Sequence, residues 1–192
     1  MKSRSIETEW PQHYQADLLP GLPATGPEPV DLRATTHGHG REGLVVRVRA
    51  GTRSWIGNFQ RGDGKLTGIF ATPSPDHMCV IASGRGYWLR ALDATDCHIV
   101  RAYPIQDVRA IAELSLLVFA DYTDLVAYGV EGMRWLSQSV SWDGITILSA
   151  DQNGILGLGW DARIEKEVGF FVDVRSGRVE GGAAPHVPGA QS

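Results

Sequence analysis

Apolar residues recur along the middle and end of the chain in short runs that polar turns separate. The run Met78–Ala82 is repeated in type at Leu116–Ala120 and again at Ile155–Gly159, at intervals of about 40 residues. A polar or glycine turn and a second apolar run follow each of them. Apolar runs of this length between turn residues favour strands over helices. The pattern therefore predicts a series of repeated all-β units.

Each unit can be divided into four short strands. The expected strands span 66–70, 78–82, 87–92 and 98–102 in the first unit, 108–111, 116–120, 125–128 and 133–136 in the second, and 145–148, 155–160, 168–174 and 178–179 in the third. A helix is credible only at 107–116, where the apolar positions fit either period.

Four short strands in a unit of about 40 residues resemble a blade of a β-propeller. The resemblance covers residues 66–180 and implies three blade-like antiparallel sheets, too few for a closed ring. The predicted fold class is therefore all-β, as an incomplete propeller-like array or, alternatively, a β-sandwich built from the same strands. A β-hairpin and an extended N-terminal arm precede the repeats.

The hairpin is expected at residues 44–60, where apolar and polar residues alternate on both sides of Gly51-Thr52. A glycine followed by threonine suits a two-residue hairpin turn. Pairing about this turn places Trp55 opposite Val48, with Trp55 buried beside Phe59 on the apolar face.

Residues 1–42 form a Pro-rich arm or strap ahead of a single all-β domain at 43–182, and residues 183–192 form a flexible tail. The prolines and the few apolar residues of the arm leave it little surface to bury. If the arm lies on the domain, its anchors are Trp10, Tyr14, Leu18 and Leu19. Their spacing also fits a short amphipathic helix that ends before Pro20.

Composition places the chain among folded globular proteins. The chain has 192 residues, of which 43% are hydrophobic and 21% charged. It has neither a stretch of about 20 apolar residues nor a signal-peptide pattern, so a cytoplasmic protein without membrane association is expected. A net charge of −4 makes nucleic acid an unlikely partner. Cys79 and Cys97 are too few for a disulfide framework.

The residues with catalytic potential form weak patterns. Asp76 and His77 precede a strand and His98 lies one strand pair away, so the three could act as acid and base if their loops converge. A turn that uses Asp76 as a hydrogen-bond acceptor is the simpler interpretation. The pair His37 and His39 fits a solvated glycine-histidine segment better than a metal site, and neither metal nor cofactor is expected.

Basic residues of the hairpin are the candidate binding surface. Arg47 and Arg49 share one strand face, and Arg53 follows the turn. Such a stripe suits a phosphate or a partner surface. Arginines on an edge hairpin also prevent edge-to-edge pairing, and this interpretation is favoured because the aromatic residues of the hairpin point to the opposite face.

No sequence motif specifies a reaction. The chain contains no nucleophile elbow, phosphate-binding loop or dinucleotide fingerprint. The predicted function is a non-enzymatic binding or protein-interaction module for an unknown protein or small ligand. The alternative is a hydrolase-like enzyme that uses scattered carboxylates and histidines between sheets. Because Phe170 and Phe171 point to opposite faces of a strand, one face of the last sheet needs cover, which predicts a homodimer.

Overall fold

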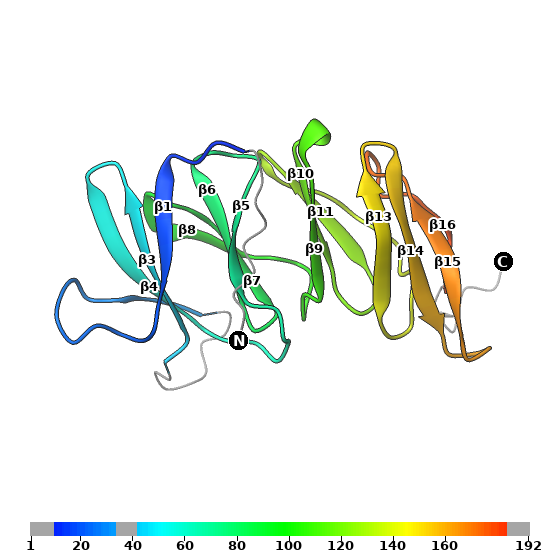
Figure 1. Ribbon diagram of the computed structural model, residues 1–192, viewed down its shortest axis with the longest axis horizontal. Helices are drawn as coiled ribbons and strands as arrows, with labels where there is room; N and C mark the ends of the chain where they lie inside the picture. Colours follow the sequence, from blue (N-terminus) through cyan, green and yellow to red (C-terminus); the bar gives the residue numbers. More distant parts are fainter. Residues whose placement is uncertain (1–9, 34–41, 184–192) are drawn as a thin grey trace. The chain divides into compact units, whose positions relative to one another are not determined.

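The computed structural model describes residues 10–33 and 42–183, and it is an all-β fold of blade-like sheets (Figure 1). The described strands form four separate sheets with four strands each. The chain divides into two compact units, Met1–Ile105 and Gln106–Ser192, and each of them holds two of the sheets. Among the described residues, no helix is long and apolar enough to cross a membrane.

The first sheet contains the predicted hairpin and two further strands. Its members are β1 (Tyr14–Leu19), β2 (Val30–Leu32), β3 (Leu44–Ala50) and β4 (Arg53–Phe59), in the order β1-β3-β4-β2. The hairpin has the predicted register, with Trp55 opposite Val48, and Gly51 in the turn has a φ of 58°. This left-handed conformation explains why the turn uses glycine.

The Pro-rich segment supplies the two outer strands of this sheet. β1 pairs antiparallel with β3 over its whole length, and β2 pairs parallel with the last three residues of β4. The amphipathic helix considered for this segment is therefore not formed. Backbone pairing with β3 satisfies the donors and acceptors of β1, whereas a short isolated helix would be marginally stable in water and would leave several of them without partners.

The second sheet is a meander in which each strand pairs with its neighbours in sequence. Its strands are β5 (Gly68–Ala71), β6 (His77–Ala82), β7 (Arg85–Arg90) and β8 (Asp93–Ile99). The fourth strand was expected at 98–102, and this boundary is wrong. A tight turn at 91–92 allows Asp93 to pair with Arg90, so β8 begins earlier.

The core of the first unit lies between the first two sheets. It contains Val46 and Val48 of β3 together with Met78 and Val80 of β6, all essentially inaccessible. Trp55, predicted to be buried, lies half-buried at the margin of this core. Its indole N–H donates a hydrogen bond of 2.8 Å to the carbonyl of Ala91, in the turn before β8.

The second unit consists of two more meanders. The third sheet has β9 (Asp107–Ile111), β10 (Leu116–Ala120), β11 (Leu125–Gly129) and β12 (Gly132–Leu136), and the fourth has β13 (Ile145–Asp151), β14 (Gly154–Asp161), β15 (Lys166–Val172) and β16 (Val179–Gly181). Residues 107–116, whose apolar positions fitted a helix or a strand, form β9 and a single 3-10 turn at Ala112–Leu114. They do not form an α-helix.

The core of the second unit lies between one face of each of its sheets. Val118 of β10 packs in it with Ile155 of β14 and with Phe170 and Val172 of β15. Every residue of β10 is buried, as expected for a strand apolar on both faces. In β14, by contrast, the side chains that point away from this core remain accessible.

Candidate functional site

The predicted catalytic candidates lie on the second sheet, in the first unit. Cys79 lies opposite Trp88, which lies opposite His98. His77, two residues before Cys79, therefore shares a sheet face with His98. The side chain of His77 contacts Ser74, whereas that of His98 contacts Asp96.

His77 belongs to a local turn. Its backbone N–H donates to the carbonyl of Ser74 at 3.1 Å, and its Nδ1 lies 2.8 Å from the Ser74 hydroxyl. Partial burial lowers the pKa of His77 below its ordinary value of 6.5, and nearby Asp96 acts in the opposite direction. The imidazole is therefore mainly neutral near pH 7.

The acidic candidate also has a partner of its own. The Asp76 carboxylate lies 2.9 Å from Nδ1 of His13, while His98 Nε2 lies 3.4 Å from a carboxylate oxygen of Asp96. Within the described ranges, no three His, Cys, Asp or Glu side chains are grouped closely enough to hold a metal ion. The candidate pair His37 and His39 lies outside the described residues.

The three arginines of the hairpin do not form one patch. Arg49 pairs with Asp17 of β1 at 2.6 Å, and Arg47 lies opposite the same aspartate in the β1–β3 register. Arg53 lies opposite Ala50, on the face that also carries Trp55. β1, which was not expected as a strand, thus brings a carboxylate to the basic stripe and reduces its positive charge.

A shallow apolar groove occupies the edge of the first unit. This edge groove has a volume of about 510 Å³, and its lining comes from β2, from the start of β4 and from the start of β8. The lining residues are Val30, Thr52, Arg53, Ser54, Trp55, Leu92, Asp93, Ala94 and Thr95. A further hollow of about 310 Å³ shares Val30, Ala94 and Thr95 with it and extends to Cys97 and Ile99.

The β4 backbone is open along this groove. β2 covers β4 only from Gly57 to Phe59, so Arg53–Ile56 has no neighbouring strand on that side in the described part of the chain. β8 is likewise the outer strand of its own sheet. Unpaired strand edges offer backbone donors and acceptors to an added strand.

Charged residues border the groove and its extension. The Asp31 carboxylate accepts hydrogen bonds from Asn58 and Arg33, and these lower its pKa. The Asp93 carboxylate accepts bonds from the hydroxyl and backbone N–H of Thr95, which likewise lower its pKa. Both carboxylates remain ionised at neutral pH, so the rim carries fixed negative charges beside Arg53.

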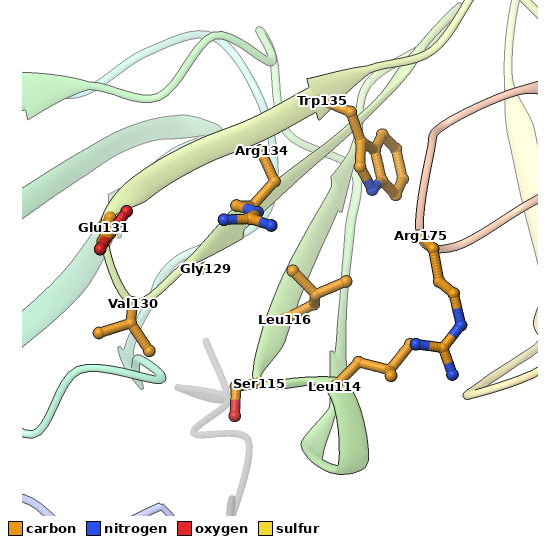
Figure 2. A pocket seen from close by; sticks show the side chains of 9 residues that line it. All are labelled: Leu114, Ser115, Leu116, Gly129, Val130, Glu131, Arg134, Trp135 and Arg175. Carbon is orange, nitrogen blue, oxygen red and sulfur yellow. The ribbon is translucent and has the colours of Figure 1, made fainter.

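The second unit has a cleft of about 350 Å³ between the β9–β10 connection, β12 and the turn after β15 (Figure 2). Its lining is Leu114, Ser115, Leu116, Gly129, Val130, Glu131, Arg134, Trp135 and Arg175. Figure 2 shows the Arg134 and Arg175 side chains on either side of the space beside Leu116.

Neither the edge groove nor the cleft was among the sequence predictions. Arg53 was a candidate for its charge, but Trp55 of β4 and Leu92 of the turn between β7 and β8 line the same groove only because the two sheets pack together. Arg134 lies on β12 of the third sheet, and Arg175, far from it in sequence, lies in the turn between β15 and β16 of the fourth sheet. No spacing rule connects such residues, so no local signal could have identified either site.

Comparisons with known proteins identify no family. No family model matches the chain, and no curated protein sequence matches it. Among solved structures, the chain is similar to the crystal structure of the N-terminal domain of Nup159, with 13% sequence identity and a TM-score of 0.41. The match covers 93% of this chain and 52% of that chain, so this chain spans about half the length of its structural neighbour.

Proposed function

We propose that the protein is a non-enzymatic interaction module that binds an extended segment of a partner protein in the edge groove. The observation that carries this proposal is the open half of β4 beside an apolar floor. Trp55 is half-buried there and Leu92 is 43% exposed. An apolar surface ringed by polar groups is typical of interaction sites.

The bound segment forms an added strand along Arg53–Ile56. Its backbone pairs with the open edge of β4, and every second side chain points into the groove. The apolar floor favours aliphatic or aromatic residues at those alternate positions. Arg53 and Asp93 at the rim favour opposite charges on the flanking residues, which orients the segment.

Peptides selected from a random display library with the full-length protein test this proposal. We expect selected sequences to alternate apolar and polar residues and to shift the indole N–H resonance of Trp55. Leu92→Asp should weaken their binding at least about tenfold, because it places a charge on the apolar floor. Leu136→Asp, at a similarly exposed leucine of the second unit, is the matched control and should leave binding unchanged.

Methylation of the peptide backbone separates strand addition from general hydrophobic binding. N-methyl groups at alternate peptide positions should abolish binding in one register and be tolerated in the other. Equal tolerance in both registers, or full binding to Leu92→Asp, would reject the proposed mode.

We also propose that two copies associate through the outer face of the fourth sheet. Leu148, Leu156 and Trp160 are 62%, 50% and 37% exposed there. A twofold contact covers this face in both copies at once, and antiparallel sheets pack readily face to face. Light scattering should give twice the chain mass of 20.9 kDa, and the Leu156→Glu variant should have the mass of a monomer. The mass of a monomer for the native protein at high concentration would reject this dimer.

The cytoplasm is the location we propose. Both cysteines are free thiols, which suits a reducing compartment. Fluorescence of a tagged full-length chain in its own cells tests this location.

A hydrolase remains the second candidate function, because the Ser74 hydroxyl lies 2.8 Å from His77 Nδ1. Such a contact can activate a serine nucleophile. Covalent labelling by a fluorophosphonate, lost in Ser74→Ala and in His77→Gln, would support the enzyme. An unlabelled native protein would assign this contact to the turn alone.

A further inference from the structure

We propose that the cleft of the second unit binds a small organic phosphate monoester through Arg134 and Arg175. Both guanidinium groups line the same cleft, and in the described structure neither makes a side-chain hydrogen bond or an ion pair. This inference concerns a different site from the edge groove, so the failure of either proposal leaves the other untouched.

The sheet directs Arg134 into the cleft. Arg134 lies on β12 beside Gly129 of β11, and a side chain at Gly129 would come within 3.1 Å of the Arg134 Cγ. The absence of a side chain at Gly129 therefore gives the arginine stem room to lie along the sheet. Glu131, the acidic residue of the lining, lies on the far side of Arg134 from Arg175 in Figure 2.

A compact turn holds Arg175 in place. The Asp173 carboxylate accepts hydrogen bonds from the backbone N–H groups of Arg175 and Ser176 and from the Ser176 hydroxyl. The turn ends at Gly177, where an added Cβ would lie only 2.8 Å from the Trp135 ring. Close packing on Trp135 thus fixes the turn that presents Arg175 to the cleft. The Asp173 carboxylate, which engages the turn through its Oδ1, also lowers the positive charge near Arg175.

The wall between the arginines is apolar. Leu116 and Trp135 are each 7% exposed, and the Trp135 indole N–H is already bonded to the carbonyl of Val174 at 2.8 Å. The ring therefore offers carbon surface and no free donor. A ligand that fills this cleft needs an anionic head for the arginines and a small apolar body for the wall.

The arrangement favours phosphate over carboxylate. One guanidinium can occupy both oxygens of a carboxylate in a bidentate pair. Two guanidinium groups that approach from a strand and from a separate turn need oxygens in more than one plane, which a tetrahedral phosphate provides. Its charge of about −2 at neutral pH also matches two arginines.

Calorimetric titration of the full-length protein with phenyl phosphate tests the site. Arg134→Gln and Arg175→Gln should each raise the Kd at least about tenfold, because each removes charge-assisted hydrogen bonds. Arg178→Gln, an exposed arginine outside the cleft, is the matched control and should leave the Kd unchanged. Gly129→Ala keeps both charges but displaces the Arg134 stem, and it should weaken binding as well.

Two further ligands distinguish the sources of such a phosphate. A phosphotyrosine peptide that binds more tightly than phenyl phosphate would assign the site to phosphorylated proteins, and equal affinity would assign it to a free small molecule. Phenylacetate should bind more weakly than phenyl phosphate. Equal binding of phenylacetate, no measurable binding of phenyl phosphate, or an equal loss in Arg178→Gln would overturn the proposal.

Discussion

The first sheet and the three sheets that follow are assembled in different ways. In the second, third and fourth sheets every strand pairs with its neighbours in sequence, so each sheet forms from one continuous segment. In the first sheet the β3–β4 hairpin is completed by β1 on one side and β2 on the other, which come from a preceding Pro-rich segment.

This difference has a consequence for function. In a meander each strand is followed at once by its partner in the sheet. β2 is only three residues long and leaves the first half of β4 open. The first sheet, which remote strands complete only in part, therefore offers half of β4 as an open backbone edge that borders the edge groove.

The largest effect should come from removing an outer strand of the first sheet. Deletion of residues 1–20 removes β1, whose Tyr14 lies in the first core, and it exposes the edge of β3. We expect the free energy of unfolding of the first unit to fall by about 3 kcal/mol or more, from lost apolar burial and backbone pairing. Urea unfolding followed by tryptophan fluorescence measures the loss.

Deletion of residues 179–192, which removes the short and mostly exposed β16, is the matched change in a meander. It should cost less than the loss of β1. An equal fall in the free energy of unfolding for the two deletions would contradict the prediction that β1 stabilises its sheet more than β16 does.

A change in the hairpin turn tests the locally formed part of the first sheet. Gly51→Val should lower the free energy of unfolding by about 1–3 kcal/mol, because a β-branched residue is strained at a positive φ. Nothing lies within 4 Å of the added Cβ, so the cost comes from the backbone alone. Gly51→Asn should cost much less, since asparagine tolerates this region. Thermal unfolding should give the highest midpoint for the native protein, a slightly lower one for Gly51→Asn and the lowest for Gly51→Val. Similar midpoints for the two variants would contradict this prediction.

Trp55→Phe tests the link between the first sheet and the second. It removes the indole N–H that donates to the carbonyl of Ala91 and keeps most of the apolar surface. We expect a loss of about 1 kcal/mol, the usual net value of one hydrogen bond. Amide hydrogen exchange should accelerate in the β7–β8 turn. Unchanged exchange in that turn would show that the bond does not hold it.

The smallest effect concerns the pH dependence that the turn before β6 contributes. Because burial lowers the pKa of His77, the unfolded chain takes up the proton first as the pH falls below 6.5. The stability from neutral His77 is therefore complete above that pH and declines toward the lower folded pKa. The urea midpoint of the native protein should decrease more between about pH 7.5 and pH 5 than that of His77→Gln. Parallel curves would contradict this assignment.

Local patterns predicted the strands of the meanders well. The second strand of the second repeat was expected at 116–120 and is β10, with the same ends. The hairpin register was also confirmed, because alternation and turn chemistry act over neighbouring residues. The start of β8 was missed because its residues, from Asp93 to Ile99, are mostly polar and carry little periodic signal.

The sequence by itself determined the all-β class, the repeated units and the hairpin, since each follows from the period and turn residues of a continuous segment. The tertiary structure alone decided that β1 and β2 complete the first sheet, because no pattern in a Pro-rich segment specifies the strand with which it pairs. It also decided which of the apolar faces remain accessible, and it brought Trp55 to Leu92 and Arg134 to Arg175. Pairing and packing between residues distant in sequence depend on the whole fold, and both candidate sites are built from such contacts.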